Sequence, residues 1–208
     1  MSGAGRTRQF AVGDARGVDG VETQHSQRCL FKYDGFRCLV RKSGAQVDLI
    51  SRQGKSFNPS FPEVAAAVAA VPGDFVWDAE LATGAGRGVA AFRRLQDRAR
   101  LKLAKSVIVA ARRSPARIFL FDMMISGRRD LRALPVLERK AHLRDAFEDT
   151  PTLVYSSSII GAGAAVFDEV RRHGFEGMVA KRLTSPYCAG RTKDWLKIKD
   201  SGYGRQGF

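Results

Sequence analysis

The sequence predicts an α+β fold in which antiparallel sheets are flanked by helices. The chain has 208 residues, of which 44% are hydrophobic, enough for one sizeable core or two small domains. Short segments that alternate polar and apolar residues are interleaved with segments of helical period. The two kinds of segment do not follow a regular strand–helix–strand order, which argues against a doubly wound parallel sheet.

The N-terminal segment, residues 1–27, is rich in Gly, Arg, Gln and Ser and shows no steady period. We therefore expect a flexible tail with at most one short element, followed by a single folded domain at 28–208. Two or three short strands are expected at 29–42 and 46–55, joined by tight turns at Asp34-Gly35 and Ser43-Gly44.

The later elements follow from period and from helix signals. In the strand at 74–83, Phe75, Trp77 and Ala79 should share one face and Asp78 and Glu80 the other. The other elements are expected to be a helix at 61–73, a basic helix at 91–105, a strand at 117–124, helices at 134–149 and 164–174, and strands at 176–182 and 194–200.

The formal net charge of +14 makes a polyanion the natural partner, either nucleic acid or an anionic membrane surface. No apolar run is long enough to span a membrane, and the N-terminus lacks a secretory signal. The three cysteines are widely spaced, which predicts reduced thiols in the cytoplasm and argues against a zinc site.

The segment FKYDGFR, residues 31–37, places Lys32 between two aromatic residues. A lysine amine is a nucleophile once it has lost its proton, and both burial and nearby cations favour the neutral form. Arg37, Lys197 and Lys199 are such cations if the fold brings them close. Taken alone, this short pattern fits a β-turn with a solvated lysine better than a nucleophile.

Further segments match a known pattern in order along the chain. They are KYDGFR from Lys32, SRQG from Ser51, DAE from Asp78, FLFD from Phe119, EGMVAK from Glu176 and WLKIK from Trp195. Together they resemble the motifs of covalent nucleotidyltransferases, which include ATP-dependent DNA ligases, RNA ligases and mRNA capping enzymes. Longer stretches such as FEGMVAKRLTSPYCAGRTKDWLKIK are similar to the bacterial ligase domains of non-homologous end joining, which favours a DNA ligase.

The resemblance implies the covalent nucleotidyltransferase (ATP-grasp-like) fold and a reaction that begins with ATP. Lys32 would be the catalytic residue, taking AMP from ATP and passing it to a DNA 5′-phosphate. Glu176 would help to hold Mg²⁺ or another divalent cation. The residues implied to bind ATP are Asp34, Arg37, Arg52, Glu80, Phe121, Lys197 and Lys199. Among these, Glu80 would meet the ribose and Phe121 the adenine, with Phe119 as the less favoured aromatic.

Simpler interpretations stay open for several of these residues. Glu80 and Glu176 can be surface acids, Phe121 a core residue and Arg52 a solvated turn residue. The basic helix face is either solvated or in contact with DNA phosphates. The candidate DNA contacts on it are Arg93, Arg94, Arg98 and Lys102.

Two features depart from the family pattern. Leu30 stands where many relatives carry Glu beside the adenine. Only eight residues follow Asp200, so no OB-fold domain is expected in this sequence. The expected partners are nicked or broken duplex DNA and a separate OB-fold or end-joining protein, with no membrane. Two other functions stay open: a non-catalytic DNA-binding module on the same fold, and an RNA ligase or capping-type nucleotidyltransferase.

Overall fold

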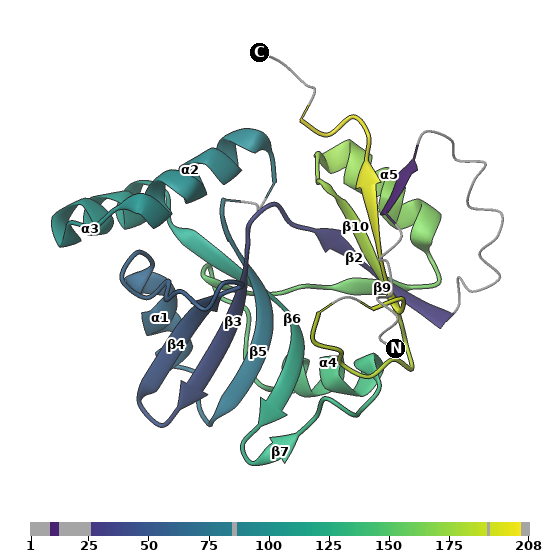
Figure 1. The fold of residues 1–208 in the computed structure, drawn as a ribbon, viewed down its shortest axis with the longest axis horizontal. Coiled ribbons are helices and arrows are strands. Elements are labelled where there is room, and N and C mark those ends of the chain that lie inside the picture. Colours follow the sequence, from purple (N-terminus) through teal and green to yellow (C-terminus); the bar gives the residue numbers. More distant parts are fainter. Residues whose placement is uncertain (1–8, 13–25, 85–86, 191, 205–208) are drawn as a thin grey trace, which may run out of the picture.

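The computed structural model describes residues 9–12, 26–84, 87–190 and 192–204, which form two sheets (Figure 1). The smaller sheet has the strand order β1-β11-β10-β2-β9, and the larger has β4-β3-β5-β6-β7 with β8 paired to β6. The pairings are antiparallel except β1–β11 and β6–β8. The predicted α+β fold with antiparallel sheets is therefore confirmed.

The strands are β1 (Gln9–Val12), β2 (Gln27–Lys32), β3 (Phe36–Ser43), β4 (Gln46–Ser51), β5 (Phe75–Thr83), β6 (Ala116–Ser126), β7 (Arg129–Asp130), β8 (Leu153–Tyr155), β9 (Ser158–Ile160), β10 (Gly177–Arg182) and β11 (Trp195–Asp200). The helices are α1 (Pro62–Ala69), α2 (Val89–Arg100), α3 (Ala104–Arg113), α4 (Val136–Asp145) and α5 (Gly163–His173). In the described part of the chain, none of these helices has the length and apolar character needed to cross a bilayer.

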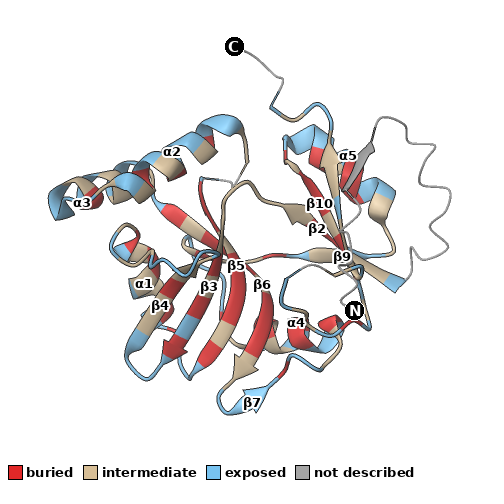
Figure 2. Cartoon of the chain, in the orientation of Figure 1, coloured by how far each residue is buried: buried red, intermediate tan, exposed pale blue. Residues whose placement is uncertain are grey.

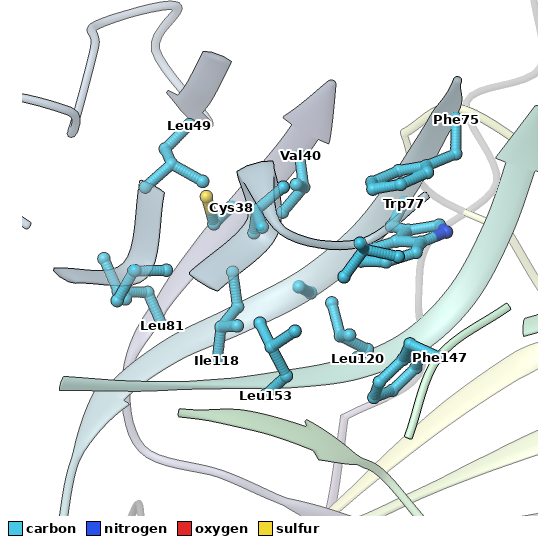
Figure 3. Close-up of a cluster of buried hydrophobic side chains, with 14 of the residues drawn as sticks. Cys38, Val40, Leu49, Phe75, Trp77, Leu81, Ile118, Leu120, Phe147 and Leu153 are labelled. Carbon is cyan, nitrogen blue, oxygen red and sulfur yellow. The ribbon is translucent and has the colours of Figure 1, made fainter. Parts of the chain in front are cut away.

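The main core lies on one face of the larger sheet (Figure 3). Phe75 and Trp77 of β5 stack with ring centroids 3.6 Å apart, and Ile118 and Leu120 of β6 pack into the same cluster. Figure 2 shows buried positions running along β5 and β6. The predicted apolar face of the 74–83 strand is confirmed, so the polar side chains of β5 are left for the opposite face.

A second, smaller core lies between α5 and the smaller sheet. Val166 and Val170 of α5 pack with Phe175 and Met178. The helix ends at Gly174, whose φ of 65° is left-handed, as expected for a glycine in this capping position. Each sheet therefore has its own apolar cluster.

The turn at Asp34-Gly35 does not form a hairpin, which corrects part of the strand prediction. β2 pairs with β9 and β10, whereas β3 pairs with β4 and β5, so residues 33–35 cross from one sheet to the other. A Cβ at Gly35 would lie 2.3 Å from the Leu81 carbonyl oxygen, so only glycine allows this close approach. The crossing leaves Lys32, the last residue of β2, at the junction of the sheets.

The predicted basic helix at 91–105 is also corrected. α2 ends at Arg100, Leu101 is extended, and α3 begins at Ala104. Leu103 continues the apolar spacing in the sequence, but its side chain is 73% exposed and does not pack on the core. Of the predicted tail, residues 1–27, most lies outside the described residues. Its one described strand, β1, pairs with β11.

Candidate active site

Two lysines are placed side by side by the register of the smaller sheet. Lys32 of β2 lies opposite Gly177 of β10, and Gly177 lies opposite Lys199 of β11. Residues in register on neighbouring strands project from the same face of a sheet. Gly177 adds no side chain between the lysines, and a Cβ there would lie 2.1 Å from the Ile198 carbonyl oxygen. The side chains of Lys32 and Lys199 therefore project from the same face, and their amines share one space.

Glu176 bridges these two amines. Its Oε1 accepts a hydrogen bond from Lys199 Nζ at 2.7 Å, and its Oε2 accepts one from Lys32 Nζ. Burial alone would raise the pKa of Glu176, but the two lysine hydrogen bonds outweigh it and hold the pKa below its usual value. The side chain of Lys32 is 21% exposed, so its amine lies within the site and within reach of solvent.

Lys197 lies two residues before Lys199 on β11 and shares its face. Its side chain is exposed, yet partial desolvation lowers the pKa of its ammonium, and the charges of Lys32 and Arg37 lower it further. Arg52, exposed in the turn after β4, adds a smaller effect of the same sign. The fold thus gathers positive groups from three separate segments around Lys32: β3, the turn after β4, and β11.

The larger sheet contributes a second row, in which Arg37 of β3, Glu80 of β5 and Phe119 of β6 lie in register. Burial raises the pKa of Glu80 to about 8. The nearby charge of Lys32 opposes this rise, whereas Asp78 adds to it. Glu80 therefore faces Lys32 across the junction as a carboxyl group that holds its proton near neutral pH.

Replacing Glu80 with Gln is expected to stabilise the protein. Between pH 4.5 and about 8 the folded chain keeps a proton that the unfolded chain releases, so burial of Glu80 costs more stability as pH rises. The gain in unfolding free energy should be near zero at pH 4.5 and reach about 1–3 kcal/mol by pH 8.

Denaturant unfolding across this pH range measures that gain. Glu148→Gln is the control, because the side chain of Glu148 is 99% exposed. If the gain from Glu80→Gln were the same at all pH values, the half-buried Glu80 carboxyl would not be protonated near neutral pH.

Arg37 is held by Asp78, a motif residue to which the sequence assigned no role, and by Tyr187, which lies outside the short motifs. Its Nε and Nη2 donate to the two oxygens of Asp78 at 2.9 and 2.6 Å. The Tyr187 hydroxyl donates to Asp78 at 2.8 Å and accepts from Arg37 at 3.1 Å. Asp78 lies on the larger sheet and Tyr187 in the loop between β10 and β11, so this cluster also ties the sheets together.

Asp34 is held by Tyr203, a residue that no motif indicated. The Tyr203 hydroxyl donates to Asp34 Oδ2 at 2.5 Å and accepts from the Gly88 N–H at 3.1 Å. Burial raises the pKa of Asp34, and the negative charge of Glu176 adds to the rise. Only the folded chain brings these residues together, since Tyr203 and Asp34 are far apart in sequence.

The two candidate aromatics differ in exposure. The ring of Phe119 is stacked by Tyr33 with centroids 3.9 Å apart, and the residue is 4% exposed. Phe121 is half-buried, and Lys181 Nζ lies 4.8 Å from its ring centroid. Phe121 is thus the more accessible of the two, although its contact with adenine stays a prediction.

Three of the four candidate DNA contacts, Arg93, Arg94 and Lys102, are exposed. Arg98 is buried, so the prediction that it contacts DNA at the surface is wrong. It is 3% exposed, and its guanidinium pairs with Glu63 at 2.6 Å and donates to the carbonyl oxygens of Ser60 and Ser114. Its role is to tie α2 to α1 and to the start of β6.

Among the described residues, no three His, Cys, Asp or Glu side chains gather into a ready-made metal cluster. Mg²⁺ usually takes one or two carboxylates and completes its shell with water and substrate phosphates. Glu176 and Asp34, which lie close enough to affect each other's charge, fit that kind of shared site. A divalent cation here would be held jointly with a phosphate-bearing substrate.

A lysine amine surrounded by cations and carboxylates lies at the junction of the two sheets, and such an arrangement is chemically suited to nucleophilic attack on a phosphorylated substrate. A family model described as ATP dependent DNA ligase domain matches residues 18–199. The chain therefore belongs to the ATP-dependent DNA ligase domain family.

Similar proteins agree with this assignment. A probable DNA ligase of Anaeromyxobacter sp. (strain Fw109-5) is 37% identical over 89% of this chain and 36% of its own length. A DNA ligase of Thermococcus fumicolans is 33% identical over 81% of this chain and 31% of its own length. The chain thus spans about a third of these relatives. The solved ligase domain of M. tuberculosis LigD is 27% identical, with a TM-score of 0.66 over 83% of this chain and 53% of that one.

Proposed function

We propose that this chain is the adenylation domain of an ATP-dependent DNA ligase that serves in DNA nick or break repair, with Lys32 as the residue that carries AMP. The observation that supports this most is the row of Lys32, Gly177 and Lys199, bridged by Glu176 and facing Glu80. A structure described as mycobacterial DNA ligase D complexed with ATP and MES is similar to this chain, with 26% identity and a TM-score of 0.65, which supports ATP as the substrate.

The reaction we propose has three displacements at phosphorus. The neutral amine of Lys32 attacks the α-phosphorus of ATP, the N–P bond forms, and the bond to pyrophosphate breaks. A 5′-phosphate oxygen of nicked DNA then attacks the same phosphorus, which breaks the N–P bond and returns the amine. Finally the 3′-hydroxyl attacks the DNA phosphorus, and AMP leaves as the nick closes.

The amine must leave Glu176 and lose its proton to solvent before the first attack, since an ammonium has no lone pair to donate. Lys197 and Lys199 stabilise the negative charge that develops on the α-phosphate. Arg37 presents its guanidinium at a fixed position because Asp78 and Tyr187 hold it.

Other side chains bind the nucleotide. Glu80 pairs with the ribose hydroxyls, Phe121 stacks on the adenine, and Asp34 and Arg52 border the phosphates. Mg²⁺ or a similar divalent cation, held by Glu176 together with the substrate, would supply positive charge to the phosphate oxygens. Duplex DNA with a nick or break is the proposed nucleic-acid substrate, and a protein with an OB-fold domain or an end-joining role is a candidate partner.

Labelling by ATP and by GTP tests this function. With Mg²⁺, we expect label from [α-³²P]ATP but not from [α-³²P]GTP to remain on the chain, and to pass to the 5′-phosphate of nicked DNA. Label from GTP, or transfer to nicked RNA in preference to DNA, would instead support a capping-type or RNA ligase. Salt-sensitive DNA binding with no label, even after a separate OB-fold protein is added, would support a non-catalytic DNA-binding module.

A further inference from the structure

A basic cavity lies at the end of the larger sheet where β5 stops and β6 begins. Its volume is about 450 Å³. It is distinct from the space around Lys32, and its lining includes Gly84, Arg94, Arg113, Ser114, Arg117 and Thr152.

Among the described residues that line this cavity, three are arginines and none is acidic. Arg94 of α2 and Arg113 at the end of α3 are exposed, and neither makes an ion pair or hydrogen bond with any residue in the described part of the chain. Like charges gathered in one concavity repel each other and attract an anion. Guanidinium groups also present forked donors that match phosphate oxygens.

The cavity is held in shape by surrounding bonds. Arg117 Nε donates to the Pro151 carbonyl oxygen at 3.0 Å, which fixes the arginine on β6. The buried Arg98 donates to the Ser114 carbonyl oxygen at 3.0 Å, and its partner Glu63 accepts from the Ala116 N–H at 3.1 Å. The rim between α3 and β6 is therefore anchored to the core.

Through Arg117, the cavity adjoins the face of the larger sheet that carries the candidate active site. Arg117 is two residues before Phe119 on β6, so both project from one face, about 7 Å apart along the strand. The Arg117 guanidinium lies 5.5 Å from the Phe119 ring centroid, and Tyr33, next to Lys32, stacks on that ring. Arg117 and Phe119 thus connect the cavity with the residue next to Lys32.

We propose that this cavity binds a backbone phosphate of the DNA substrate, beyond the nucleotide site, through Arg94, Arg113 and Arg117. The choice of DNA as the phosphate source rests on the proposed ligase function. On this proposal, the basic surface of α2 and α3 is not merely solvated but includes a specific phosphate contact. α2, α3 and β6 each supply one cation to that contact.

Arg113→Ala tests this proposal against Arg112→Ala, which removes an equal charge from the neighbouring exposed residue outside the cavity lining. Binding to a fluorescent nicked duplex is measured by anisotropy from low to moderate salt. We expect Arg113→Ala to bind about 5–10-fold more weakly and to lower the salt slope by about one. Arg94→Ala should give a similar loss, while Arg112→Ala should stay within about twofold of wild type.

Equal losses in Arg113→Ala and Arg112→Ala, or no DNA binding by the wild-type chain, would overturn the proposal. A third outcome would also overturn it: both proteins bind DNA alike, but inorganic phosphate raises the melting temperature of wild type and not of Arg113→Ala. Free phosphate would then be the ligand of the cavity. Labelling of wild type by ATP, measured in parallel, tests the ligase function separately, since the binding comparison needs no chemistry. Melting curves of each variant confirm that it is folded.

Discussion

Lys32→Ala and Lys32→Arg are both expected to leave the chain without AMP after incubation with ATP and Mg²⁺. Alanine has no nucleophile, and the guanidinium of arginine stays protonated, so neither can form the N–P bond. The initial rate of labelling should fall on the order of 10³-fold or more, as is typical when a covalent nucleophile is removed.

Intact-mass measurement over time gives this rate. Lys105→Ala is the matched control, because Lys105 is an exposed lysine on α3, away from the Lys32 row. It should label at the wild-type rate. If Lys32→Ala gained AMP as fast as Lys105→Ala, Lys32 would not be the nucleophile.

Asp122→Ala is expected to cause the largest loss of stability. Asp122 is fully buried on β6, and its oxygens accept from Arg139 Nε and Nη2 at 2.8 and 3.0 Å and from Lys181 Nζ at 3.2 Å. Arg139 comes from α4 and Lys181 from β10, so this carboxylate joins a helix and both sheets. Its removal leaves two buried cations without their counter-ion.

Breaking a buried ion pair by removing one partner costs about 3–5 kcal/mol, and we expect an unfolding free energy lower by that amount. Urea unfolding measures it. Asp48→Ala removes an exposed pair with Arg41 and should cost less than about 1 kcal/mol. If the two variants lost equal stability, Asp122 would not be the link between the sheets.

Local patterns predicted most of the secondary structure, because each long element carries a clear period or end signal. The alternation in β5 and the glycine that ends α5 are examples. The short strands β7, β8 and β9 were missed, since each has two or three residues and is defined by its partner strand. The break between α2 and α3 was missed because the spacing of apolar residues continues through it.

The residues that gather at the candidate site were found through family motifs, and their roles stay predictions. Local sequence patterns cannot show that Asp34-Gly35 crosses between sheets, because pairing depends on distant strands. For the same reason, local patterns did not predict the roles of Tyr187 and Tyr203. Their hydroxyls reach Asp78 and Asp34 only in the folded chain. Arg98 fits a basic surface stripe, yet it turns inward because Glu63 lies on the neighbouring helix.

The most direct test of the account is to find which atom carries AMP. Wild-type chain treated with ATP and Mg²⁺ is digested near neutral pH, because a phosphoramidate bond is labile in acid, and its peptides are fragmented in a tandem mass spectrometer. We expect AMP on Lys32 alone. AMP on Lys199, on Lys197 or on a hydroxyl group would contradict the assignment of Lys32 as the nucleophile.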